Sequence, residues 1–150
     1  MALQIPVSLK SGHDALQATL NRAAREPGRT GEAARRVAKI LDGHMLREEK
    51  FALRPLGLLK ALGQGEAPEG LDEAVRLVQG LKREMAQMLD EHRHIAELLR
   101  LLAREARAEG RPEYVALAAD LLAHAQVEEE VLYPAALLIG EYANRLPVPD

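Results

Sequence analysis

The sequence contains two copies of one segment, and this repeat constrains the fold more than any other feature. A shift of 79 positions places His13 on His92, and a shift of 80 positions places His44 on His124. The apolar residues around these histidines match in the same way: Leu16 with Ile95, Leu20 with Leu99, Val37 with Leu117 and Leu41 with Leu121. Such a duplication predicts one supersecondary unit that is used twice.

The repeated unit is predicted to be a helical hairpin. Ala, Leu, Arg and Glu dominate the chain and β-branched residues are few, which favours helices over strands. Prolines and glycines divide the chain into four expected helices, over residues 11–26, 30–55, 71–108 and 112–134. Thr30 is expected to cap the second helix, and the residues after Pro55 and Pro134 could each add a short helix. We therefore predict an all-α fold, an up-down-up-down four-helix bundle in one domain over residues 1–150, built from pseudo-repeats over roughly 9–62 and 88–142.

Composition excludes several classes of function. The chain has no cysteine, so disulfides, thiolate catalysis and Cys-ligated metals are excluded. A net charge of −3 argues against a nucleic-acid partner, and the basic run over residues 22–39 is interpreted as a solvated helix surface. No apolar run has the length of a membrane span, and the start of the chain does not resemble a signal peptide. We therefore expect a cytoplasmic protein with no nucleic-acid or membrane partner.

Two His-x-x-x-Glu pairs stand at equivalent points of the repeat, His44 with Glu48 and His124 with Glu128. A spacing of four places both side chains of each pair on one helix face, which they share with leucines. An ionised glutamate that is buried there alone would be costly or would take up a proton. Cations between the glutamates and the histidines would remove that cost, and this predicts an inward-facing metal site.

The candidate metal ligands are four histidines and two glutamates, namely His13, His44, Glu48, His92, His124 and Glu128. This set suits Fe, Mn or Zn ions, and two bridging carboxylates suit a pair of them. His94 lies about 200° from His92 on the same helix, so it is expected at the surface or behind the ligands. Glu49, Glu129 and Glu130 are interpreted as solvated charges and Tyr133 as a packing residue, although a tyrosine there could also be redox-active.

The stretches "HMLREEKFALRP", "LDEHRHIAELL" and "HAQVEEEVLYP", together with His13, resemble the hemerythrin-like HHE cation-binding family over nearly the whole chain. The pattern is most similar to the di-iron domain of iron-sulfur cluster repair proteins, which use four His and two Glu. The resemblance implies the same six ligands. Ala96 stands where the oxygen-carrying hemerythrins have a further metal histidine.

The resemblance implies a non-heme di-iron protein that binds or reacts with oxygen, nitric oxide or peroxide in sensing, stress response or iron handling. If the chain is an enzyme, it would be a di-iron oxidoreductase acting on one of these molecules. A homodimer or an unknown protein partner is compatible with the sequence. Two alternatives are a metal-free helical interaction module and a ferritin-like iron oxidase. The second would use Glu-x-x-His motifs, of which the sequence has one, Glu91 to His94.

Overall fold

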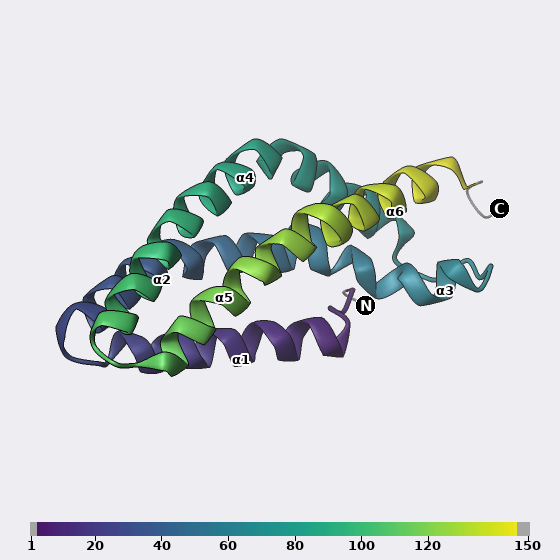
Figure 1. Cartoon of the computed structure of the whole chain (residues 1–150). Helices are drawn as coiled ribbons and strands as arrows, with labels where there is room; N and C mark the ends of the chain where they lie inside the picture. Colours follow the sequence, from purple (N-terminus) through teal and green to yellow (C-terminus); the bar gives the residue numbers. More distant parts are fainter. Residues whose placement is uncertain (1–2, 147–150) are drawn as a thin grey trace.

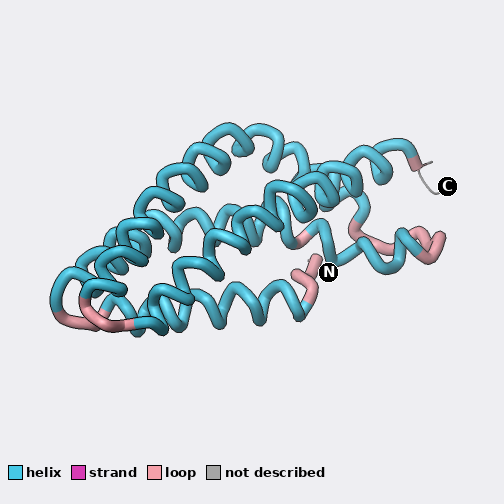
Figure 2. Tube along the Cα trace, viewed as in Figure 1, coloured by secondary structure: helices cyan, strands magenta, loops and turns pink. Residues whose placement is uncertain are grey.

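In the computed structural model of the chain, residues 3–146 are described and fold into helices joined by short loops, with no strand in that range (Figure 2). The α-helices are α1 (Val7–Ala24), α2 (Gly28–Glu48), α3 (Leu59–Gly63), α4 (Leu71–Ala108), α5 (Pro112–Val127) and α6 (Tyr133–Arg145). Three short helical turns complete the chain, a 3-10 turn at Pro55–Leu58 and two π-helical turns at Glu49–Leu53 and Glu128–Leu132.

The long helices form two antiparallel hairpins, α1 with α2 and α4 with α5, whose connecting loops lie at the same end of the molecule (Figure 1). Helix α4 packs against α2, α5 and α6, and α1 packs against α2 and α5. At the other end, α6 extends the line of α5, and α3 protrudes beside it (Figure 1). This arrangement confirms the predicted all-α four-helix bundle.

Two predicted helix starts need correction. Helix α1 begins at Val7 rather than at Ser11. Pro6 is the residue at its N-terminal boundary. Thr30 is not the N-cap of α2, which begins at Gly28. The backbone N–H and the hydroxyl of Thr30 both donate to Oε1 of Glu109, at 2.7 and 2.5 Å. The N–H of Arg29 donates to Oε2 of Glu109 at 3.3 Å, so a carboxylate from the opposite hairpin satisfies two of the free N–H groups at the start of α2.

The fourth helix was predicted to end near Pro134, but α5 ends at Val127 and a π-helical turn follows it; the short helix expected after Pro134 is present as α6, which continues to Arg145. A proline lacks an N–H and its ring crowds the carbonyl four residues earlier. Here the helix widens into a π-helical turn just before the proline, where the N–H of Tyr133 donates to the carbonyl of Glu128. The first hairpin does the same before Pro55, where the N–H of Arg54 donates to the carbonyl of Glu49 at 3.1 Å. In each hairpin the widened turn directly follows or includes the glutamate predicted to be a metal ligand, Glu48 or Glu128.

The core consists of two apolar clusters that follow each other along the bundle. On α4, the residues from Ile95 to Ala106 belong to the first cluster and those from Ala74 to Met88 belong to the second. The first cluster also includes Leu41 and Leu121, one turn before the two predicted inward histidines. His92 stands between the two clusters on α4. The fold thus places a layer of polar side chains between two layers of hydrocarbon.

Candidate metal centre

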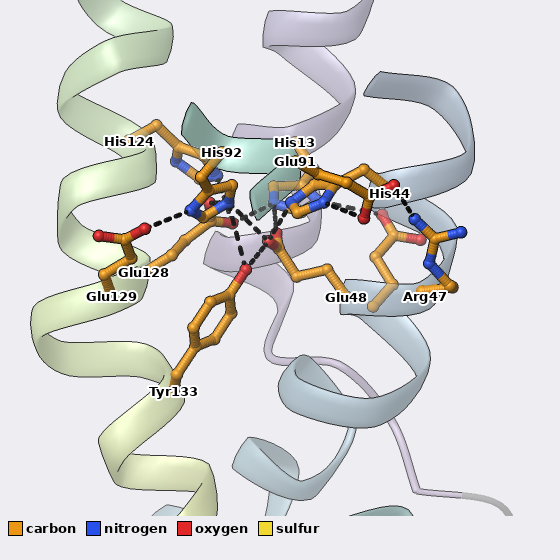
Figure 3. A network of polar contacts seen from close by, with 11 residues as sticks. His13, His44, Arg47, Glu48, Glu91, His92, His124, Glu128, Glu129 and Tyr133 are labelled. Atoms are coloured by element: carbon orange, nitrogen blue, oxygen red, sulfur yellow. Dashed lines mark hydrogen bonds and ion pairs between the residues drawn. The ribbon is translucent and has the colours of Figure 1, made fainter. Parts of the chain in front are cut away.

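All six predicted ligands lie in this polar layer, each on one of the four helices that surround it (Figure 3). The side chains of His13, His44, Glu48 and Glu128 are between 1% and 3% exposed. His92 is 6% exposed, and His124 is the most accessible at 21%. Polar groups this deeply buried require partners, because their transfer from water without hydrogen bonds or ions is costly.

The helix spacing explains how the side chains reach the layer. His44 is followed four residues later by Glu48, and each of them points inward because Leu41 on the same face belongs to the core. His124 and Glu128 occupy the equivalent places on the other hairpin, with Leu121 in the role of Leu41. The apolar flanks therefore determine the direction of both pairs, as the sequence predicted.

The side chains fall into two groups, each of which could hold a metal ion. In the first group, Nε2 of His13 lies 2.9 Å from Oε1 of Glu48 and 3.2 Å from Oε2 of Glu128. His124 completes this group, with its Nε2 at 3.1 Å from Oε2 of Glu128. In the second group, Nε2 of His44 lies 3.1 Å from Oε2 of Glu48. Nε2 of His92 completes it, at 3.4 Å from Oε1 of Glu128 and 3.7 Å from Oε2 of Glu48.

Both glutamates are shared between the groups. Glu48 presents Oε1 to the first group and Oε2 to the second, whereas Glu128 presents Oε2 to the first and Oε1 to the second. Two ligands on one ion, each about 2.1 Å from it, lie about 3.0 Å apart at a right angle and about 3.4 Å apart at the tetrahedral angle. The spacing of the nitrogen and oxygen atoms therefore suits two ions that share both carboxylates.

The chemistry of one nitrogen also fits a metal. Nε2 of His124 is buried and has no hydrogen-bond partner within residues 3–146, although Oε2 of Glu128 lies 3.1 Å away. The contact has the distance of a hydrogen bond without its directionality. A nitrogen whose lone pair is aimed at an ion between the two residues would be placed in this way.

In the metal-free centre, protonated imidazoles balance the negative charge of the buried carboxylates. Burial opposes the charged form of Glu48, but hydrogen bonds from the imidazoles of His13, His44 and His92 hold its pKa well below the usual range. Burial likewise lowers the pKa of His13, but hydrogen bonds to Glu128 and Glu48 outweigh it and raise this pKa to about 10. The same balance raises the pKa of His92 to about 10. Protons on these imidazoles provide the positive charge that metal ions would otherwise supply.

Tyr133 belongs to the centre as well as to the core. It is 2% exposed and packs in the second apolar cluster, as a packing residue should. Its hydroxyl donates a short hydrogen bond to Oε2 of Glu48 and lies 3.3 Å from Nε2 of His92 (Figure 3). Burial and the negative charges of Glu48 and Glu128 raise its pKa, which keeps the phenol protonated. Sequence reasoning predicted the packing but missed this hydrogen bond.

Glu49 and Glu129, interpreted as solvated charges, also contact the histidines of the centre: Glu49 is largely buried, whereas Glu129 is exposed as expected. Oε1 of Glu49 lies 3.3 Å from Nδ1 of His13, and Oε1 of Glu129 lies 3.0 Å from Nδ1 of His92. Glu91, which the sequence suggested only as part of a ferritin-like motif, places Oε1 3.2 Å from Nδ1 of His44. These three glutamates, Glu49, Glu91 and Glu129, are called the outer carboxylates below. Each of them reaches a histidine on a different helix, which periodicity along one helix does not reveal.

The remaining predicted side chains lie outside the centre. His94 is exposed, so His92 is the histidine of α4 that faces the two glutamates. Glu130 is exposed and accepts a hydrogen bond from Gln126 at 2.9 Å, as a solvated charge would. Because His94 is remote from Glu48 and Glu128, the Glu91-to-His94 motif does not assemble a ferritin-like site.

A small cavity adjoins the centre on the side of the first apolar cluster. It has a volume of about 20 Å³, enough for one water-sized molecule. His44, His92 and His124 contribute polar walls to it, together with both shared glutamates. The rest of its lining is apolar and consists of Leu41, Met45, Ile95, Leu121 and Ala125. A small, weakly polar molecule could therefore contact the centre there.

Comparisons of the chain with known protein families, with curated proteins and with solved structures gave no match. Within residues 3–146, no helix combines the length and the hydrophobicity that crossing a membrane would require. The residues of the centre and their geometry are therefore what indicates the function of this chain.

Proposed function

We propose that this chain is a hemerythrin-like, non-heme di-iron protein that binds or reacts with a small ligand such as oxygen, nitric oxide or peroxide. The observation that supports this most is the sharing of Glu48 and Glu128 between two pairs of histidines. One ion would be held by His13 and His124 and the other by His44 and His92, with one oxygen of each glutamate for each ion.

The donor set supports iron among the possible metals. Imidazole nitrogens with carboxylate oxygens suit Fe, Mn and Zn, whereas no thiolate is present to favour softer ions. Helical bundles that carry two metals on inward carboxylates and histidines are an established use of this architecture. The similarity of the four motifs to the HHE family agrees with iron as the physiological metal.

The surrounding residues support reaction with a small ligand. Iron, when bound, would supply electrons to such a molecule. The cavity beside the centre has room for about one water-sized molecule, and part of its wall is apolar, which favours a small, weakly polar ligand. Tyr133 donates its proton to Oε2 of Glu48, so it fixes the orientation of that carboxylate. Sensing, stress response and iron handling are the roles that we propose for this chemistry.

The proposal is tested by expressing the protein with iron and measuring the iron content together with the near-ultraviolet and visible spectrum. We expect two irons per chain and a charge-transfer absorption that changes when oxygen, nitric oxide or peroxide is added. The variant His92→Ala should lose iron, whereas its neighbour His94→Ala should retain it and serves as the matched control. A chain that contains no metal and whose stability is unchanged by a chelator would instead be the metal-free interaction module.

A further inference from the structure

The four histidines of the centre differ in the partners of Nδ1, the ring nitrogen that points away from the shared glutamates. Each ring turns Nε2 toward the shared glutamates, which leaves Nδ1 on the outer side. The outer carboxylates contact three of these Nδ1 atoms, at 3.0 to 3.3 Å, in the pairs His13 with Glu49, His44 with Glu91 and His92 with Glu129. An Nδ1–H that donates to a carboxylate fixes the tautomer in which Nε2 is free to bind a metal.

Glu91 is the most firmly held outer carboxylate. Its second oxygen forms a short ion pair with Arg47, so Arg47 and His44 of α2 are both connected to α4 through one side chain (Figure 3). Glu129 is more exposed, yet it makes the shortest of the three contacts, with His92. Both histidines of the second group therefore have an outer carboxylate.

His124 is the exception. Within residues 3–146 no outer carboxylate contacts its ring, and its side chain is the most exposed of the four at 21%. The two acidic residues that follow Glu128 are engaged elsewhere, Glu129 with His92 and Glu130 with Gln126. The first group consequently has one histidine with an outer carboxylate, His13, and one without, His124, whose ring contacts Glu128 and the ring of His13.

We propose that the two metal positions are inequivalent, and that the position formed by His13 and His124 fills second and empties first. This inference rests on the proposed two-metal function. Outer partners of metal-bound histidines typically contribute about 10- to 100-fold to metal affinity. The second position has two such partners and the first position has one, so a gap of this size is expected between them. Glu91 and Glu129 are then positioning residues for the tighter site.

The order of filling can be observed directly on the histidine rings. The metal-free protein, labelled with ¹⁵N in histidine, is titrated with Zn²⁺, and the ring signals are followed by NMR. We expect the signals of His44 and His92 to shift during the first equivalent and those of His13 and His124 during the second. His94 is exposed and remote from the centre, so its signal is the internal reference.

Variants of the outer carboxylates test whether these side chains cause the order in which the two metal positions fill. Glu91→Ala and Glu129→Ala should each weaken the first-filled position by about 10-fold or more, which narrows or abolishes the separation of the two steps. Glu91→Gln retains an oxygen that accepts the Nδ1–H, so it should restore part of the loss. Glu130→Ala, a change of the same kind one residue away, should leave both steps unchanged. Circular dichroism of each variant shows that the bundle is intact.

The outcomes separate this inference from the proposed function. If all four rings shift together, or if His13 and His124 shift first, the inference is wrong while a two-metal centre still stands. If Zn²⁺ shifts no ring, the inference is also wrong, and the iron content of the expressed protein then decides the proposed function independently. An unchanged separation between the two filling steps in Glu91→Ala and Glu129→Ala would show that these side chains do not position the ligands.

Discussion

Tyr133→Phe is the change that most sharply tests the network around the shared glutamates, because it deletes one oxygen atom and leaves the ring in place. The ring is 2% exposed and stacks on the imidazole of His92 with a centroid separation of 5.8 Å. The variant therefore retains the apolar packing and opens no cavity of consequence. What it loses is the hydrogen bond that the phenol donates to Glu48.

The size of the effect follows from the charge of the acceptor. A hydrogen bond to a charged group contributes about 1.5 to 3 kcal/mol to stability. Glu48 keeps its contacts with His13 and His44, so its charge remains compensated and the upper end of that range is not reached. We expect the free energy of unfolding of the metal-free protein to fall by about 2 kcal/mol. For a chain of this size the midpoint of thermal unfolding should then fall by roughly 4 to 8 °C.

Urea unfolding of the metal-free protein measures this loss. The midpoint should move to lower urea while the slope m is unchanged, since the surface exposed on unfolding is the same. Tyr142→Phe, at a residue of α6 that is 47% exposed, is the matched control and should change the free energy by less than about 0.5 kcal/mol. Equal stability of Tyr133→Phe and the native chain would refute the hydrogen bond as a stabilising interaction.

Two further predictions concern packing and pH. Gly140→Ala should destabilise the bundle by about 1 to 3 kcal/mol, because a Cβ there would lie 2.5 Å from Cγ1 of Val78; Gly43→Ala, where nothing lies within 4 Å, should stabilise α2 by about 0.5 to 1 kcal/mol. Thermal unfolding of both variants measures the contrast, and equal effects would contradict it. In the metal-free protein, His13 and His92 keep their protons up to a pKa of about 10 in the folded state, against about 6.5 when unfolded. Between these values the folded chain binds more protons, so stability should fall as pH rises from about 6.5 to about 10, by up to about 1.4 kcal/mol per pH unit for each histidine. Urea unfolding across this range checks the slope, and a flat profile would contradict it.

The sequence predicted the bundle because its helices are long and their boundaries are marked by proline and glycine. Helix α4 begins at Leu71 and ends at Ala108, as the pattern predicted, and α5 begins at Pro112. The end of α5 was mispredicted because Pro134 normally terminates a helix, whereas a π-helical turn accommodates it here. Whether a π-helical turn forms depends on how α5 and α6 pack in the bundle. The rule that a proline ends a helix considers one residue at a time and therefore does not predict such a turn.

The six candidate ligands were accessible to the sequence because each stands on an apolar helix face at a repeated position. The contacts of the outer carboxylates could not be predicted from the sequence. The position of a side chain around its own helix does not show which residue of a neighbouring helix it contacts. Glu129 follows Glu128 by one residue and so lies about 100° around the helix, which on an isolated helix is the solvent side. In the bundle this direction leads to α4, where Nδ1 of His92 lies 3.0 Å away.

The two layers of carboxylates also explain how such a centre can exist before any metal binds. Two buried glutamates facing each other without cations would be strongly unfavourable. In the folded chain, imidazoles that keep their protons lie within hydrogen-bond distance of Glu48 and Glu128, and the outer carboxylates hold the rings in that orientation. The rings are therefore already placed with Nε2 toward the centre when the bundle folds. Ions that enter this layer must displace those protons, so the same contacts that stabilise the metal-free fold make metal binding more favourable as pH rises.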